Sequence, residues 1–397
     1  MQRLKRISDI RIKRISLSFK RYLFNEINWN ERLIGISGAR GTGKTTILLQ
    51  QLKQKGLKHD EAIFVSLDDI YFANNHLVYF AEDFVSHGGK FLFIDEIHKY
   101  PNWSQELKNI YDNLPELKVV FTGSSALDIF KGKYDLSRRA LVYTLKGLSF
   151  REYIEFLYDI TIKPLLLDEI LSSSFDYIYK LGKIEKPLKL FGKYLQYGYY
   201  PFFNDNSVSY QIRLLETINT VLESDLTNIF NIDRSSVRKL KKFVYLLASM
   251  FPFKPNILKL SEKLEVTRPT MLRFLELLDR ANIISLLTAD TYGINYLVKP
   301  EKIYLENTNL MYAFEPDRVN IGTLRETFFL NQLNVKHKIS YPKQGDFLVD
   351  NKYLFEVGGK NKTNKQIAGI KNSFIAADDI EYAYKNIIPL WLFGFLY

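Results

Sequence analysis

The sequence predicts an α/β protein: a parallel β-sheet with helices on both faces, followed by a helical region and a small α+β domain. From Arg32 onward, short apolar runs alternate with amphipathic stretches, which is typical of strands that alternate with helices. The runs lack strict apolar–polar alternation, as expected for strands covered on both faces. Beyond Ser149, this alternation gives way to long helical patterns rich in Phe, Tyr and Leu. Strand patterns return from Lys302.

Five strands are expected in the α/β domain, at 33–37, 62–66, 91–94, 119–122 and 141–145, with helices opening near Lys44, Phe80, Trp103 and Ala126. Later strands are expected at 346–349, 353–357 and 389–397. The 397 residues divide accordingly into a basic N-terminal helical arm (1–30), the α/β domain (31–150), a helical region (151–250), a helix-turn-helix region (251–300) and an α+β region (301–397).

Composition excludes several kinds of site. The chain has no cysteine, which removes disulfides, thiolate nucleophiles and Cys-containing zinc sites. Its five histidines form no HxxxH or HxH pair, so we expect no His-rich metal site. The longest apolar run, 387–397, contains Pro389 and Gly394 and is too short to cross a bilayer. Since the N-terminal residues also lack an apolar signal core, we expect a cytoplasmic protein without a membrane partner.

The net charge of +11 makes an acidic partner such as nucleic acid worth testing. Much of this charge lies in residues 1–21, which contain eight basic residues and one acidic residue, Asp9, and so have a net charge of +7. Two interpretations stay open for this segment. It is either a solvated basic helix that packs one apolar stripe on the next domain, or an arm that binds phosphates or a partner.

A glycine-rich segment lies between the first strand and the first helix of the α/β domain, and it matches GxxxxGK[ST]. Glycines let the backbone wrap a phosphate chain, the helix dipole attracts negative charge, the lysine reaches the terminal phosphates and the threonine ligates Mg²⁺. The expected ATP-binding residues are Gly38, Ala39, Arg40, Gly41, Thr42, Gly43, Lys44, Thr45 and Thr46, with Thr45 also a ligand of Mg²⁺.

The strand at 91–94 runs into Asp95 and Glu96. A carboxylate at the end of an apolar strand is the second half of a P-loop site, because it holds Mg²⁺ directly or through water. Asp95 fits that role. Glu96 fits a base that orients water for attack on the γ-phosphate. Together the two motifs predict a P-loop NTPase sheet.

Two further segments are candidates for the same site. The strand at 119–122 is followed by small hydroxyl residues, of which Ser124 either bonds the attacking water or caps a helix. Arg138 and Arg139 precede the last strand, where an arginine neutralises charge in the transition state, in cis or across a subunit boundary. A solvated arginine pair is the competing interpretation.

The order of the segments GARGTGKTT, FLFIDEIHK, VVFTGSSA, SRRA, LKGLSFREYIEF, YLQYGYYPFF and VLESDL resembles a prokaryotic group of AAA-type ATPases. The resemblance covers nearly the whole chain from about Leu33. Members of that group carry a C-terminal winged helix and a degenerate PD-(D/E)XK nuclease-like domain of uncertain function. The resemblance implies ATP binding, hydrolysis assisted by Glu96, an arginine finger at Arg138 or Arg139, and hence a homo-oligomer.

Residues 258–262, a turn at 264–266 and residues 268–280 have the proportions of a helix-turn-helix, with Thr267 as the cap of the second helix. Arg268, Thr270 and Arg273 would lie at the front of a recognition helix. Residues 256–300 hold six basic and five acidic residues, a net charge of only +1. A DNA-binding winged helix and a purely structural one therefore both stay open.

The C-terminal region contains a candidate nuclease-like cluster, Glu326, Asp346, Glu356 and Lys360. Lys360 follows the acid Glu356 by four residues, whereas the active nuclease pattern has two. This departure shifts the amine by about 7 Å of strand, unless a bulge at the intervening glycines recovers it. The region is either an active metal-dependent nuclease or a nuclease-derived binding or scaffold domain.

The leading hypothesis is an Mg²⁺-dependent AAA-type ATPase that uses ATP to drive a conformational change on a partner, with duplex DNA as the first candidate. One alternative is a nucleotide-gated switch that acts on a protein partner. The other is an ATP-controlled nuclease, which requires the C-terminal acids to hold metal.

Overall fold

The structure is a computed structural model of residues 1–397. It describes residues 1–58, 60–123, 136, 138–172, 186–204, 207–227, 233–249, 255–289, 300–363 and 365–397. The chain folds into two compact units, Met1–Lys146 and Gly147–Tyr397. Within the described ranges, no helix is both long and apolar enough to cross a membrane.

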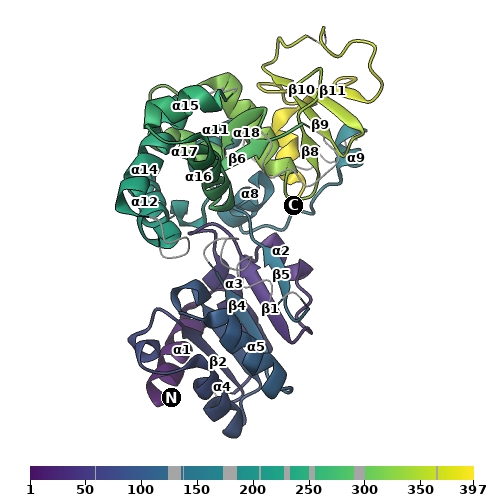
Figure 1. The fold of residues 1–397 in the computed structure, drawn as a ribbon. Coiled ribbons are helices and arrows are strands. Elements are labelled where there is room, and N and C mark those ends of the chain that lie inside the picture. The colour runs from purple at the N-terminus through teal and green to yellow at the C-terminus, as the bar shows by residue number, and fades with distance from the viewer. Residues whose placement is uncertain are drawn as a thin grey trace. The chain divides into compact units, whose positions relative to one another are not determined.

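A five-stranded parallel sheet forms the centre of the first unit (Figure 1). Its strands are β1 (Leu33–Ser37), β2 (Ala62–Ser66), β3 (Phe91–Asp95), β4 (Lys118–Thr122) and β5 (Leu141–Thr144). The order in the sheet is β2-β3-β4-β1-β5, so β4 separates the two strands that lead into the predicted nucleotide motifs. All five predicted strands are confirmed to within one residue at each end.

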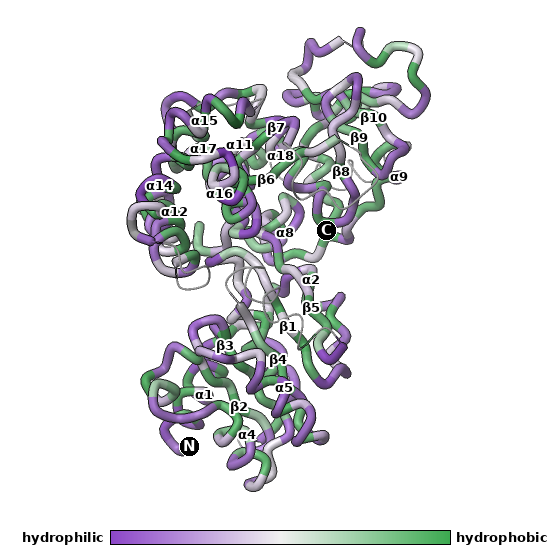
Figure 2. Tube along the Cα trace, in the orientation of Figure 1, coloured by the Kyte–Doolittle hydropathy of each residue, from purple (hydrophilic) through white to green (hydrophobic). Residues whose placement is uncertain are grey.

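Helices cover both faces of this sheet because successive strand residues point to opposite sides. Ile63 and Val65 of β2 pack with α4 (Leu77–Ser86) and α5 (Trp103–Asn113). Phe64 packs with α2 (Tyr22–Glu26) and α3 (Lys44–Lys55). Two short 3₁₀ helices, η1 (Ile70–Ala73) and η2 (Ile97–Lys99), follow β2 and β3. The P-loop NTPase fold is confirmed, and Figure 2 shows the apolar strands as green segments at its centre.

Two helix predictions for this unit have different outcomes. The helix expected near Phe80 begins three residues earlier, at Leu77, whose side chain is completely buried and so belongs to the same apolar stripe. The helix expected near Ala126 lies outside the described residues.

Helix α1 (Gln2–Arg14) lies along β2 at the edge of the sheet (Figure 1). β2 pairs with β3 alone, and the backbone N–H of Phe64 donates to Ser8 Oγ of α1 at 3.0 Å. Leu4 of the helix is buried in the sheet's core, while Arg3 forms an ion pair with Asp69 at 2.8 Å. The N-terminal basic segment therefore contains a helix that packs on the α/β domain, as the first interpretation expects.

The second unit opens with helices. These are α8 (Phe150–Tyr158), α9 (Leu167–Leu171), α11 (Pro187–Tyr197), α12 (Ser207–Thr220) and α14 (Arg234–Ser249), with a 3₁₀ turn η3 (Pro201–Asn204) and a π-helical turn η4 (Val221–Asp225). The helical pair that follows is α15 (Ile257–Leu264) and α16 (Arg268–Arg280). An antiparallel pair, β6 (Ile284–Leu287) and β7 (Lys302–Leu305), completes this part. The boundary predicted near residue 250 lies outside the described residues.

The C-terminal part is a mixed sheet with the order β12-β11-β10-β9-β8. Its elements are α17 (Thr308–Phe314), α18 (Ile321–Leu333), β8 (Ile339–Ser340), β9 (Phe347–Val349), β10 (Tyr353–Gly358), β11 (Ser373–Ala377), β12 (Ile387–Pro389) and η5 (Leu390–Phe395). The strand expected at 389–397 is wrong. Only Pro389 belongs to a strand, and the next six residues form a 3₁₀ helix that is buried on all sides. A short, wholly apolar run does not distinguish a buried strand from a buried helix.

Candidate nucleotide-binding site

The loop between β1 and α3 holds a backbone conformation that depends on glycine. Gly38, Gly41 and Gly43 have φ angles of +153°, +85° and +97°. A Cβ atom added at Gly38 would lie 2.2 Å from the carbonyl oxygen of Leu145. The loop leads directly into the first turn of α3, where unsatisfied N–H groups and the helix dipole favour a phosphate group.

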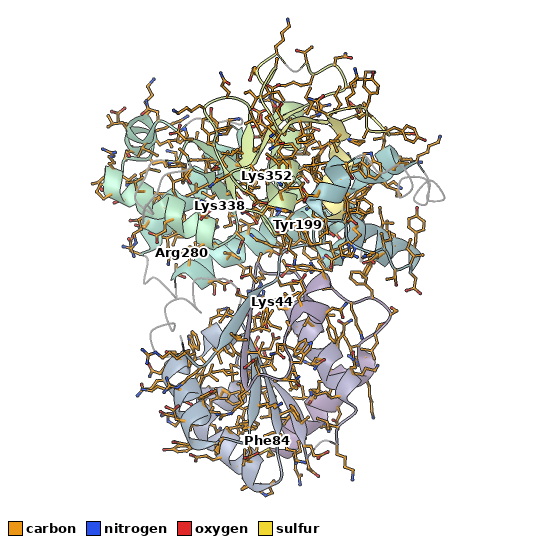
Figure 3. All side chains as sticks on the ribbon, turned by 90° about the vertical axis from the view of Figure 1, so that its right-hand side faces the viewer. Lys44, Phe84, Tyr199, Arg280, Lys338 and Lys352 are labelled. Carbon is orange, nitrogen blue, oxygen red and sulfur yellow. The ribbon has the colours of Figure 1, made fainter. Side chains whose placement is uncertain are left out.

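Lys44 opens α3 and is buried, with 5% of its surface exposed. Its ammonium group donates to the carbonyl oxygens of Gly38 at 2.8 Å and Ala39 at 2.9 Å. Thr42 Oγ1 also donates to Ala39 O, at 2.9 Å. The lysine is therefore held inside the curve of the loop, at the end of the first unit's sheet (Figure 3).

Asp95 connects three elements of the sheet's carboxyl edge. It ends β3 and is buried, with 4% of its surface exposed. Its Oδ2 accepts a hydrogen bond from Thr45 Oγ1 at 2.8 Å, and its Oδ1 accepts one from Thr122 Oγ1 at 2.5 Å. Burial raises the pKa of Asp95, and the bonds from Thr122 and Thr45 oppose that shift.

The donors around Asp95 fit a bound Mg²⁺ ion. A carboxylate and a threonine hydroxyl are oxygen ligands of the kind that Mg²⁺ prefers. The Asp95 carboxylate is buried, and the side-chain hydrogen bonds that it accepts come from two neutral hydroxyl groups. A divalent cation would compensate its charge, so Thr45 and Asp95 are the residues that would hold it.

Glu96 is fixed in an uncommon conformation beside Asp95. Its φ angle of +54° lies in the left-handed region, which costs a non-glycine residue free energy and is concentrated at functional sites. The backbone N–H of Glu96 donates to Thr122 Oγ1 at 3.2 Å, and its Oε2 lies 3.3 Å from Nε2 of the buried His98. The Glu96 side chain is one-fifth exposed as a whole, whereas its Oε2 is buried.

Two residues of this site were missed by the sequence analysis. Thr122 bonds both Asp95 and Glu96, whereas the hydroxyl chosen from the sequence, Ser124, lies outside the described residues. Thr122 is itself one of the small hydroxyl residues at the end of the strand predicted at 119–122, and this pattern is the sequence signal that could have identified it. Arg21 is buried and donates to the carbonyl oxygens of Thr42 at 2.5 Å and Lys146 at 2.8 Å. No local pattern distinguishes it from the other basic residues near the N-terminus.

Of the remaining predicted phosphate-binding residues, Arg40 in the loop and Thr46 in the first turn of α3 are half-buried. The structure does not bring Arg138 and Arg139 to this site. They precede β5, whose Leu141 pairs with Ile34 near the amino end of β1. Even Leu141 is therefore three residues, or about 10 Å of strand, from the level of Ser37, after which the loop begins.

The two arginines also differ from each other. Arg139 donates from Nε and Nη2 to the two oxygens of Asp112, at 2.8 Å and 2.9 Å, and this pairing lowers the pKa of Asp112. Arg138 is exposed.

In the second unit, a lysine that the sequence analysis did not select joins two of the predicted acids. Lys302 Nζ lies 2.9 Å from Glu326 Oε2 and 3.6 Å from Asp346 Oδ1. Burial opposes the charge on Lys302, but Glu326 and Asp346 together raise its pKa. Tyr304 donates to Glu326 as well, at 2.5 Å. Glu326 is therefore paired with a protein cation, and the same cation lies near Asp346.

Glu356 on β10 is completely buried, and its cationic neighbour is Lys362, at 3.4 Å. Lys360 is exposed. In the described part of the chain, neither Glu356 oxygen accepts a hydrogen bond, and no group of three or more Asp, Glu or His side chains is arranged to hold a metal ion. Lys302 thus contacts Glu326 and Asp346, while Lys362 contacts Glu356. Asp346 also accepts a hydrogen bond from the N–H of Val357, the residue after Glu356, at 3.0 Å.

The sheet order, the glycine loop and the Lys44–Thr45–Asp95 arrangement define a P-loop NTPase. The model of a family described as an AAA domain matches residues 30–154, which span the sheet and the glycine loop of the first unit. A second family, described as a domain of unknown function (DUF8612), matches residues 188–320.

Among curated proteins, the chain is 27% identical over 379 residues to the uncharacterized protein MJ1637 of Methanocaldococcus jannaschii, covering 86% of this chain and 78% of that protein. Among solved structures, it is similar to AMPPCP-bound DnaA from Aquifex aeolicus, with a TM-score of 0.27 and 14% identity over 65% of this chain and 85% of that one. It is also similar to PCH-2 of C. elegans, with a TM-score of 0.25 and 17% identity over 70% and 66% of the two chains. TM-scores of this size do not define a shared architecture for the whole chain.

Proposed function

We propose that this protein is an Mg²⁺-dependent ATPase that converts ATP binding and hydrolysis into a conformational change acting on duplex DNA. The observation that supports hydrolysis is the joining of Thr45, Asp95 and Glu96 through hydroxyl groups at the carboxyl ends of β3 and β4. Lys44 lies at the neighbouring loop. These are the groups that phosphoryl transfer from a nucleotide to water requires.

Each residue has a definite task in this proposal. Lys44 exchanges its bonds to the loop carbonyls for bonds to phosphate oxygens. Thr45 and Asp95 hold Mg²⁺, which when bound neutralises charge on the phosphates. Glu96 orients water and accepts its proton. Thr122 fixes the positions of both acids.

Steady-state ATP turnover with Mg²⁺ tests the catalytic part. Lys44→Ala should abolish nucleotide binding, measured with a fluorescent ATP analogue. Glu96→Gln should bind that analogue normally and hydrolyse ATP about 100-fold more slowly, as the loss of a positioned base would predict. A Glu96→Gln protein with full turnover would remove Glu96 from the mechanism.

We further propose that Arg138 serves the nucleotide site of another copy of the chain, since its place at the amino end of the sheet does not serve its own. Lys44→Ala and Arg138→Ala proteins are each expected to be inactive alone. Their mixture should regain activity, because one supplies the arginine and the other the intact site. A mixture as inactive as its components would contradict this assignment.

For the C-terminal half we propose a winged helix, formed by α15, α16, β6 and β7, and a nuclease-derived scaffold without cutting activity. The Lys302 contacts with Glu326 and Asp346 support the scaffold, because an ammonium group takes the place that a metal would need. Incubation of duplex DNA with the protein and Mg²⁺ should leave the DNA intact. Cleavage that disappears in an Asp346→Ala variant would overturn this proposal.

DNA as the partner is tested by turnover at low salt with and without a duplex, where phosphate contacts are strongest. Several-fold stimulation is expected. Unchanged turnover would contradict DNA as the partner that the ATPase cycle serves.

A further inference from the structure

Helix α14 is the most uniformly basic helix of the second unit's described part. It carries Arg234, Arg238, Lys239, Lys241 and Lys242 and no acidic residue. From α14 to the end of α16, residues 234–280 hold eleven basic and four acidic residues, a net charge of +7. The window of the helix-turn-helix taken alone, 256–300, has a net charge of only +1. The charge of this region therefore depends on a helix outside the predicted DNA-binding motif.

Helix α14 has one buried apolar side and one exposed basic side. Its apolar side is buried through Val237, Leu240, Phe243, Val244 and Leu247. Arg238 and Lys242, one helical turn apart, are exposed on the opposite side. The helix thus presents a cationic stripe to solvent.

A hydrogen bond from another lysine of α14 links this helix to the helix-turn-helix. Lys239 Nζ donates to the carbonyl oxygen of Glu265 at 2.6 Å, and Glu265 is the left-handed residue that ends α15. Arg268, the first residue of α16, follows three residues later, so its backbone lies within about 11 Å of that contact. Helices α14 and α15 pack on each other, as do α15 and α16 (Figure 1).

Among the described residues, some basic side chains of α14 and α16 form ion pairs within the protein, and others do not. Lys241 is paired with Glu223, and Arg280 with Glu276. In the ranges that the structure describes, Arg238, Lys242, Arg268 and Arg273 make no ion pair, and all four are exposed. These four cations come from the exposed face of α14 and the amino-terminal half of α16.

We propose that α14 and the amino-terminal half of α16 form one phosphate-binding surface for duplex DNA, with Arg238 and Lys242 contacting the backbone beside the helix that faces the groove. The inference deepens the proposed function, because it names the surface that would bind the partner. Exposed cations suit a polyanion better than they suit a protein interface, whose core is depleted of charge and rich in apolar anchors.

The test is binding of a fluorescein-labelled 25-base-pair duplex to the full-length protein, followed by fluorescence anisotropy without nucleotide at 50 to 200 mM salt. Replacing Arg238 and Lys242 together with alanine removes two phosphate contacts. The slope of log affinity against log salt should become shallower by about 1.8. Between 50 and 200 mM salt, the wild type should then lose about 12-fold more affinity than the variant loses.

The matched control replaces Lys189 and Lys193 with alanine. These two lysines are exposed at the same spacing on α11, so the control removes the same charge from another helix of the same unit. The control should keep the wild-type slope. An Arg238/Lys242 variant with the wild-type slope, or a control that loses as much, would overturn the proposed surface, as would a wild-type protein that does not bind the duplex at 50 mM salt.

ATP turnover of the same proteins keeps this inference separate from the proposed catalysis. Arg238 and Lys242 are not among the residues to which the proposed function gives a task in catalysis. Basal turnover of the Arg238/Lys242 variant should therefore equal that of the wild type. Loss of DNA binding with normal basal turnover supports the surface, whereas absent turnover in the wild type would count against the ATPase proposal alone.

Discussion

Replacing Thr122 with valine removes its hydroxyl group while keeping the shape of its buried side chain. That hydroxyl donates to Asp95 Oδ1 at 2.5 Å and accepts from the Glu96 N–H at 3.2 Å. The substitution therefore leaves a buried carboxylate with one hydroxyl donor, from Thr45, and releases a backbone that is held at a positive φ angle.

The expected loss of stability follows from the two bonds. A hydrogen bond to a charged group contributes about 1.5–3 kcal/mol, and a neutral one about 1 kcal/mol. Thr122→Val should thus reduce the free energy of unfolding of the first unit by about 2.5–4 kcal/mol, or roughly 5–16 °C in its melting temperature. Thr122→Ser is the control, because it keeps both bonds and loses one methyl group, which costs about 0.5–1.5 kcal/mol.

Catalysis should respond more strongly than stability. If Thr122 positions Glu96, the valine variant should show about 100-fold slower turnover at saturating ATP, because small displacements of a catalytic group have effects of this size. The serine variant should stay within severalfold of wild type. Thermal unfolding and a coupled ATPase assay measure both quantities, and equal behaviour of the valine and serine variants would refute the role given to the hydroxyl.

Three further outcomes are expected. Burial raises the pKa of Asp95 in the folded protein, so the ionised carboxylate lowers the free energy of unfolding at any pH above the unfolded-state pKa. Without nucleotide, the Asp95→Asn variant should therefore have a higher melting temperature than the wild type at pH 7–8. This difference in melting temperature should shrink toward pH 4. A constant difference across that range would contradict the shift. Gly38→Ala should abolish nucleotide binding, since its methyl group meets the Leu145 carbonyl oxygen, whereas Gly56→Ala, at φ +61° with open space around it, should cost only about 1 kcal/mol. Arg21→Ala should weaken nucleotide binding at least tenfold by releasing the Thr42 carbonyl, and normal binding by titration would exclude that role.

The nucleotide domain could be predicted closely from the sequence because its signals are local. Apolar runs fix the five strands, and the glycine loop must lie between a strand and a helix to work. Asp95 and Glu96 are recognisable for the same reason, since they follow an apolar strand directly. In a parallel sheet, a residue that directly follows a strand in the sequence lies at the carboxyl edge of the sheet.

The residues that the sequence did not reveal act through contacts between distant segments. Arg21 reaches Thr42 and Lys146, and Lys302 reaches Glu326 and Asp346, pairings that no spacing rule encodes. Lys360 was chosen by its distance along the chain, while the lysine near Glu356 is Lys362, which the fold of the following loop brings back. The basic face of α14 does not show in the net charge of the helix-turn-helix, because α14 precedes that part of the chain.

The helix along the edge of β2 has a practical consequence for work on the isolated P-loop domain. The matching family model begins at residue 30, which invites expression of residues 30–154. Such a fragment would lack α1 and with it Ser8, the acceptor for the Phe64 N–H, and Leu4 from the core. It would also lose Arg21, and its bare strand edge would be open to pairing with other chains. A fragment that begins at Met1 should remain monodisperse where the shorter one aggregates.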